Sequence, residues 1–129
     1  MMSWLLAAFL VAHGLAHLAV WLPPAPADTE HAAPFAPDHS AVLAATRVPP
    51  TTIHRTAVWL AVAAAVAYVV AGLAVALGSG WTVPLVATAA ALLGLALKIL
   101  FFHPWLSLGI LFDAAVLVFA VGSWPVALT

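Results

Sequence analysis

Cysteine is absent from the 129-residue sequence, and charged side chains make up only 5% of it. The lack of cysteine excludes disulfides, thiolate metal sites and thiol nucleophiles. Three basic and four acidic side chains are too few to cover a soluble domain, in which about a quarter of the residues are charged. A net charge of −1 also excludes nucleic acid as a partner on electrostatic grounds.

Apolar residues are abundant instead, at 67% of the sequence. They fall into runs over about residues 4–22, 56–77, 82–102 and 105–124. Each run has roughly the 20 residues that a helix needs to cross the hydrocarbon of a bilayer. The runs lack the alternation of a barrel strand, so helix is the expected form. The sequence predicts an all-α, integral membrane four-helix bundle, a single transmembrane domain over residues 1–129 with the lipid bilayer as its main partner.

The connections between the runs differ in length. Residues 78–80 and 103–104 are tight turns of glycine, serine, histidine and proline, which make the helices on either side antiparallel neighbours. A long Pro-rich loop spans residues 23–53. Its middle, residues 38–46, is predicted to form a short helix capped by Asp38, which the prolines at 49–50 would end.

A competing interpretation makes the first run a signal peptide cleaved at residues 25–27. The segment before the run has no lysine or arginine, and the run is too long for a signal sequence. We therefore favour a first membrane span.

Tryptophans and cations bear on the placement in the membrane. The six tryptophans fall near run ends, as an interfacial belt would: Trp4, Trp21, Trp59, Trp81, Trp105 and Trp124. Arg47, Arg55 and Lys98 lie toward the 23–53 loop, so the positive-inside rule predicts a cytoplasmic loop and both termini outside. Because only three charges carry this bias, the opposite orientation with both termini inside stays open. The richness in alanine and scarcity of lysine indicate a bacterial genome, and hence a multi-pass protein of the cell inner membrane.

Ionisable residues inside the apolar runs are the main functional signal, because such groups are costly in a membrane. His13 and His17 are spaced i, i+4 and share one face of the first helix. Lys98, Asp113 and Tyr68 each continue a stripe of small residues, the kind of face on which membrane helices pack closely. All five side chains are therefore expected to point into the bundle as one polar cluster.

Depth supports this arrangement. Counted from the loop side, His13 and Asp113 lie roughly 12–14 Å deep at 1.5 Å per residue, and His17 and Lys98 roughly 6–8 Å deep. We expect the fourth long helix to lie against the first, with Asp113 within hydrogen-bonding range of His13. Three further side chains rim the same membrane face: His54, Arg55 and His103.

The stretch from Leu10 to Leu18, with its His-Gly-x-x-His-Leu pattern, resembles the first helix of a family of small uncharacterised bacterial four-helix integral membrane proteins. Two later segments are also similar to elements of that family: the Arg-led segment at residues 54–59 and the segment from His103 to Asp113. The family has Asn more often near the position of Asp113. The resemblance implies four helices and a pairing of the first helix with the last. It brings no activity with it.

Four functions remain open. The first is binding or relay of a proton or small cation by His13, His17 and Asp113, since the ordinary pKa of histidine lies near neutral. The same three side chains form a candidate site for zinc or another divalent metal. Haem held between helices ranks lower, because the other membrane-associated histidines are at the rim. The fourth is a structural or accessory subunit, either as a homo-oligomer or in a larger membrane complex, which needs no chemistry of its own. An enzyme is not indicated, because no nucleophile lies beside a base in the sequence.

Overall fold

The structure, a computed structural model, describes residues 1–22, 37 and 39–127, with side chains described up to residue 123. Helices and the turns between them account for the regular structure of these residues, so the predicted all-α class is confirmed. The elements in chain order are α1 (Met2–Trp21), α2 (Ala41–Ala45), α3 (Pro50–Ala76), α4 (Thr82–Leu100), the single 3₁₀ turn η1 (Pro104–Leu106) and α5 (Ser107–Ala127).

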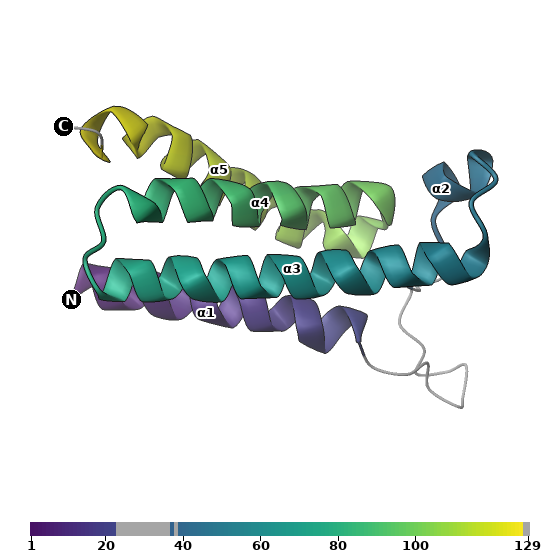
Figure 1. Cartoon of the computed structure of the whole chain (residues 1–129), viewed down its shortest axis with the longest axis horizontal. Coiled ribbons are helices and arrows are strands. Elements are labelled where there is room, and N and C mark those ends of the chain that lie inside the picture. The colour runs from purple at the N-terminus through teal and green to yellow at the C-terminus, as the bar shows by residue number, and fades with distance from the viewer. Residues whose placement is uncertain (23–36, 38, 128–129) are drawn as a thin grey trace.

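The four long helices form a bundle in which α1 packs along α3, α3 along α4, and α4 along α5. The start of α1 and the last turns of α5 lie at one end of the bundle, and α2 lies beyond the other (Figure 1). The backbones of α1 and α5 hardly approach each other. The predicted packing of the fourth long helix against the first is therefore wrong for the backbones, and α1 and α5 meet only through side chains.

Four helical segments are long and apolar enough to cross a membrane. The outer surface agrees with this property, because large apolar side chains are exposed on every long helix. Phe9, Val66, Leu92 and Val118 are examples, the last with 73% of its surface exposed. A soluble monomer rarely exposes contiguous apolar surface on this scale, whereas lipid solvates it.

The observed helix boundaries differ most at α3, which begins at Pro50 rather than near residue 56. Proline suits the first turn of a helix because its missing N–H would be unpaired there anyway. At 27 residues the helix is about 40 Å long and exceeds a hydrocarbon core of about 30 Å. His54 and Arg55 therefore lie within the first turns of α3 rather than before it. The predicted span 105–124 is divided into η1 and α5.

The short helix α2 closes the loop end of the bundle. Its N-cap is Ser40, whose Oγ accepts from the Leu43 N–H at 3.2 Å. The same hydroxyl donates to the carbonyl oxygen of Leu100 at 2.5 Å, which ties α2 to the end of α4. The predicted cap, Asp38, lies outside the described residues, as do the cleavage site considered at residues 25–27 and about half of the Pro-rich loop.

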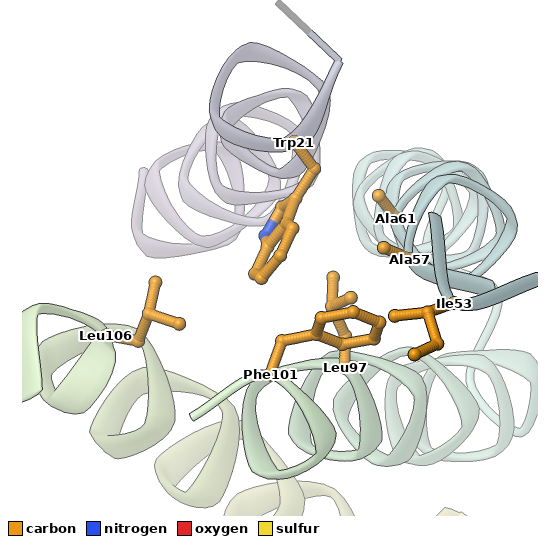
Figure 2. Packing of buried hydrophobic residues seen from close by; sticks show 7 residues of the cluster. All are labelled: Trp21, Ile53, Ala57, Ala61, Leu97, Phe101 and Leu106. Carbon is orange, nitrogen blue, oxygen red and sulfur yellow. The ribbon is translucent and has the colours of Figure 1, made fainter. Parts of the chain in front are cut away.

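Beneath α2 lies an apolar cluster contributed by α1, α3, α4 and η1. Trp21 is 2% exposed and meets Phe101 edge to face at 5.5 Å between ring centroids, as Figure 2 shows. The prediction that Trp21 belongs to an interfacial belt is therefore wrong. Trp4, Trp59, Trp81 and Trp105 are exposed, and the side chain of Trp124 lies outside the described residues. The loop-end cluster comprises Trp21, Ile53, Ala57, Ala61, Leu97, Phe101 and Leu106.

Two glycines bring α1 and α3 into close contact. A Cβ atom at Gly14 would lie 2.7 Å from Cβ of Tyr68, and one at Gly72 would lie 2.9 Å from the carbonyl oxygen of Ala7. Both distances are shorter than carbon side chains tolerate, so only glycine permits this spacing. Small residues at membrane-helix interfaces serve this purpose generally.

Candidate functional site

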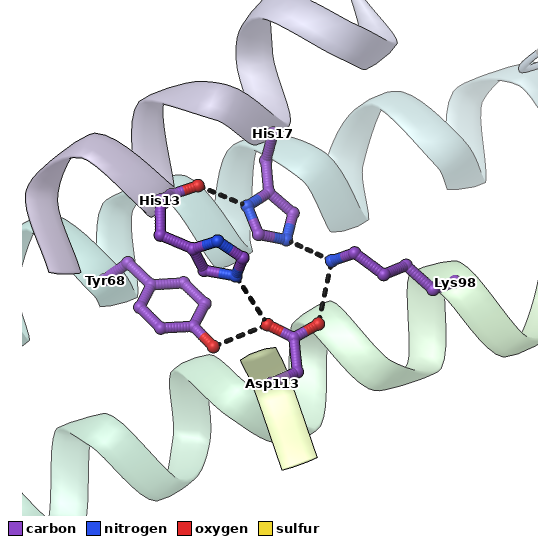
Figure 3. A network of polar contacts seen from close by, with 5 residues as sticks. All are labelled: His13, His17, Tyr68, Lys98 and Asp113. Atoms are coloured by element: carbon purple, nitrogen blue, oxygen red, sulfur yellow. Dashed lines mark hydrogen bonds and ion pairs between the residues drawn. The ribbon is translucent and has the colours of Figure 1, made fainter. Parts of the chain in front are cut away.

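The five polar side chains predicted to converge meet in the middle of the bundle (Figure 3). His13 and His17 come from α1, Tyr68 from α3, Lys98 from α4 and Asp113 from α5. The backbones of α1 and α5 hardly approach each other, so this polar cluster is a main point at which all four long helices are joined.

Asp113 is the hub of the polar cluster and is 0% exposed. Its Oδ1 accepts from His13 Nε2 at 2.8 Å and from the Tyr68 hydroxyl at 2.6 Å. Its Oδ2 accepts from Lys98 Nζ at 2.7 Å. The predicted contact between Asp113 and His13 is thus present and direct. An ionised carboxylate in an apolar bundle is tolerated only when such donors surround it.

Lys98 points into the bundle and is 5% exposed. Its Nζ lies 2.7 Å from His17 Nε2 as well as 2.7 Å from Asp113 Oδ2. The Lys98 side chain therefore does not extend to the membrane surface, although its depth of roughly 6–8 Å would allow it. The ammonium and the carboxylate compensate each other's charge, which lowers the cost of burying both.

The bonds assign a tautomer to each imidazole. His17 Nδ1 lies 2.9 Å from the His13 carbonyl oxygen, and because a carbonyl only accepts, Nδ1 carries the hydrogen. The lone pair of His17 Nε2 then accepts from the Lys98 ammonium. His13 Nε2 faces a carboxylate oxygen and so carries its own hydrogen, which leaves Nδ1 as the nitrogen outside the network.

Two glycines make room for the charged pair between α4 and α5. A Cβ at Gly94 would lie 2.5 Å from Asp113 Oδ2, and a Cβ at Gly109 would lie 2.6 Å from Lys98 Cε. Each helix thus carries a Gly-x-x-x-charged motif, and the glycine of one helix receives the charged side chain of the other. The four-residue spacing between glycine and charged residue in the sequence indicates this role. The expectation of closely packed small-residue faces did not include it.

Two phenylalanines cover the polar cluster on the side away from the loop, and sequence reasoning missed both. The Phe9 ring stacks on the His13 ring at 5.8 Å between centroids. Phe112 meets both Phe9 and His13 edge to face, at 5.6 and 5.8 Å. The aromatic pair separates the polar cluster from the apolar half of the bundle.

A cavity of about 270 Å³ opens between α1 and α5 on the loop side of Phe112. We call it the side groove. His13, His17 and Lys98 lie at its inner end. Its walls are apolar, and three of the eight wall residues are aromatic: Ala16, Val20, Trp21, Trp105, Leu106, Leu108, Gly109 and Phe112. The side groove exists because α1 and α5 do not pack backbone to backbone.

The donor atoms of the predicted metal site lie close together. One ligand atom from each of His13, His17 and Asp113 falls within 4.8 Å of the others. However, the Lys98 ammonium lies 2.7 Å from both His17 Nε2 and Asp113 Oδ2. A metal ion bridging these atoms would have to displace that ammonium, because two cations so close repel strongly in an apolar interior.

The three rim residues are not among the five bonded side chains. His54 and Arg55 are exposed on the first turns of α3. His103 begins η1, where its Nδ1 accepts from the Trp105 backbone N–H at 3.2 Å. The contact of His103 with Trp105 gives this residue a capping role at the turn between α4 and α5.

Comparison of the chain with protein-family models, curated proteins and solved structures gave no match. The resemblance of residues 10–18 to the bacterial four-helix family therefore stays a prediction. What can be argued about function rests on the chemistry of the polar cluster and on its surroundings in the bundle.

Proposed function

We propose that this chain is a multi-pass inner-membrane protein whose polar cluster binds a proton and exchanges it with the loop side through His13. The observation that carries the proposal is that His13 lines the side groove and also has a ring nitrogen outside the hydrogen-bond network. The His13 side chain is 10% exposed, whereas that of Asp113 is 0% exposed.

The two histidines have different chemical capacities. His13 can accept a second proton at Nδ1 while Nε2–H still donates to Asp113. A second proton on His17 Nε2 would break its bond with Lys98 and place two cations side by side. Imidazole is the side chain whose ordinary pKa lies closest to neutral, so His13 is the suitable residue for reversible exchange and His17 for holding Lys98 in place.

Access to the cluster is expected from one side only. The side groove reaches His13 from the loop half of the bundle. Beyond Phe9 and Phe112 lies a second cavity of about 190 Å³, whose walls are almost wholly apolar. A cavity lined by apolar groups does not hold water or conduct protons, whereas the side groove offers the polar side chains of His13, His17 and Lys98 to a water molecule. The geometry therefore favours a proton-binding site over a transmembrane channel.

Lys98 places the proton proposal ahead of divalent metal binding. Its ammonium already supplies a positive charge between His17 and Asp113. A bound proton on His13 adds one further charge, next to a carboxylate that accepts its hydrogen bond. A zinc ion would add two charges and would need ligand atoms at about 2.0–2.2 Å. Two of those atoms, His17 Nε2 and Asp113 Oδ2, already accept hydrogen bonds from Lys98.

For the orientation we propose that the loop between α1 and α3 is cytoplasmic. Lys98 belongs to the interior of the bundle, so the positive-inside argument rests on Arg47 and Arg55 at the loop end. A reporter that is active only in the periplasm, fused after residue 127, should be active. Silence of that fusion would reverse the orientation.

A structural role is the second candidate, and a specific observation favours it. Every buried side-chain nitrogen and oxygen among the described residues has a hydrogen-bond partner. A fully bonded polar network fixes which helix faces meet and at which depth, without any chemistry. The two candidates differ in whether His13 must titrate.

Glutamine variants separate them, because glutamine keeps an N–H donor and cannot titrate near neutral pH. We would purify wild type, His13→Gln, His17→Gln and the double variant in detergent. Proton uptake between about pH 8 and pH 5 is measured with a pH indicator in weakly buffered solution, and thermal unfolding is measured on the same samples.

The proposal expects His13→Gln to keep most of the stability and to lose about one proton of uptake per chain relative to wild type. His17→Gln is expected to lose stability instead. If His13→Gln is folded and takes up as many protons as wild type, the proton proposal is wrong. Loss of stability in both single variants with unchanged uptake would establish the structural role.

A further inference from the structure

The side groove has its mouth on the outer surface of the bundle. Val20, Trp105 and Leu108 border it and are 44%, 76% and 61% exposed. In a bilayer this flank of the groove faces lipid, so an organic molecule of the groove's size arrives from the hydrocarbon, whereas protons reach His13 from the loop end of the same groove. The occupant must therefore be soluble in lipid.

The inner end of the side groove offers a hydrogen-bond donor. A lysine ammonium has three N–H donors, and the bonds to His17 and Asp113 use two of them. Lys98 also lines the groove. The remaining N–H is available to an oxygen atom of an occupant at that point.

The charge of this inner end selects a neutral head group. Lys98 and Asp113 form a compensated pair, and the assigned tautomers leave both imidazoles uncharged. An anionic head would lie close to the Asp113 carboxylate in an apolar medium, where unpaired charge is costly. A carbonyl oxygen accepts the bond without adding charge.

Size and wall chemistry narrow the ligand further. About 270 Å³ exceeds the roughly 150 Å³ of an engineered cavity that holds benzene, so a substituted six-membered ring fits. Trp21, Trp105 and Phe112 supply aromatic walls, which favour offset or edge contacts with a flat ring.

We propose that the side groove binds a lipid-soluble, neutral ring carbonyl compound of the quinone type, with one carbonyl oxygen on Lys98 Nζ and its tail toward the lipid. The inference concerns binding alone and invokes no redox step. It depends on the Lys98 bonds, the groove and the uncharged form of His13; a proton on His13 leaves the groove and the Lys98 donor in place but weakens the selection against an anionic head group.

The test is equilibrium binding of decylubiquinone to lipid-free protein in detergent, followed by quenching of tryptophan fluorescence. Ala16→Leu adds three carbon atoms to a residue that lines the groove and is not one of the five side chains of the polar cluster. Ala8→Leu is the matched control, because Ala8 is exposed on the same helix and lines neither described cavity. Decanoate and dodecane serve as competitors of anionic and purely apolar chemistry.

Wild type and Ala8→Leu are expected to show saturable quenching, and Ala16→Leu an affinity at least about tenfold weaker, or about 1.4 kcal/mol. Neither competitor should displace the quinone at equal concentration. Equal affinity of Ala16→Leu and wild type would overturn the site. Displacement by decanoate would make the ligand an anion, and displacement by dodecane would make the groove a simple hydrocarbon slot; either result overturns the neutral carbonyl proposal.

Discussion

Two of the packed helix pairs, α1–α3 and α4–α5, are held close by glycines, but these glycines face different groups. Between α1 and α3, Gly14 and Gly72 receive backbone and Cβ atoms of the opposite helix. Between α4 and α5, Gly94 and Gly109 receive a carboxylate and the end of a lysine side chain. Both pairs are close, but the first is packed by rigid atoms and the second by flexible charged groups.

The difference assigns a separate task to each pair. Rigid atoms in a glycine notch set the helix spacing and cannot move out of the way. A lysine or aspartate side chain can shift, at the cost of its hydrogen bonds rather than of the helix spacing. The α1–α3 pair is therefore the stable frame of the bundle, and the α4–α5 pair is the place where charge can be rearranged.

The largest effect is expected from removing one member of the Lys98–Asp113 ion pair. Lys98→Met removes the cation and leaves the carboxylate of Asp113 buried with two donors. Loss of one partner of a buried ion pair costs about 3–5 kcal/mol, so the melting temperature in detergent should fall steeply.

The double variant Lys98→Met/Asp113→Leu is the control, because it removes both charges together. We expect it to be more stable than Lys98→Met alone. If the double variant is as unstable as the sum of both single variants, the pair is not electrostatically coupled.

The next effect concerns the rigid pair. Gly14→Ala would place a Cβ 2.7 Å from Cβ of Tyr68, and neither atom can move without its helix. Overpacking of this kind costs about 1–3 kcal/mol, which denaturant or thermal unfolding in detergent measures. Stability equal to wild type would show that α1 and α3 are less close than described.

Tyr68 connects the α1–α3 pair to the charged groups between α4 and α5. Its Cβ faces Gly14, and its hydroxyl donates to Asp113 Oδ1 at 2.6 Å. Tyr68→Phe keeps the packing and removes one of three bonds to the carboxylate, which should cost about 1.5–3 kcal/mol at most. Because the new Cβ of Gly14→Ala would press on Tyr68 itself, the combination should deviate from additivity, and full additivity would contradict the contact between Gly14 and Tyr68.

The smallest effect is expected from Gly109→Ala, whose Cβ would meet the Lys98 side chain. The lysine can move aside, and alanine favours helix over glycine by about 1 kcal/mol, so the net change should be close to zero. Gly122→Ala on the same helix has open space around it and should gain stability. If Gly109→Ala gains as much as Gly122→Ala in parallel melting curves, Lys98 does not occupy the notch.

Much of this arrangement follows from the sequence. The four apolar runs fix four helices because backbone groups in lipid must bond within their own segment. The constant rise of a helix makes depth countable, so His13 could be matched to Asp113 and His17 to Lys98 from sequence positions alone. Both matches appear as hydrogen bonds.

Other features depend on contacts between segments and could not be read in this way. Trp21 stands at a helix end, where tryptophan commonly faces the interface, but Phe101 and Leu97 surround it with apolar partners. The direction of Lys98 is decided by the notch at Gly109 on another helix. The gap between α1 and α5 arises because α1 packs on α3, α3 on α4 and α4 on α5. The predicted contact between His13 and Asp113 does not imply this packing order.

The most direct measurement of the central claim is a pH titration of the histidine ring nitrogens by ¹⁵N NMR in the detergent-purified protein, assigned with His13→Gln and His17→Gln. The account predicts that His17 keeps a protonated Nδ1 and an acceptor Nε2 across the titration, while Nδ1 of His13 gains a proton reversibly. A His17 ring that titrates while His13 stays unchanged, or two rings that never titrate, would contradict it.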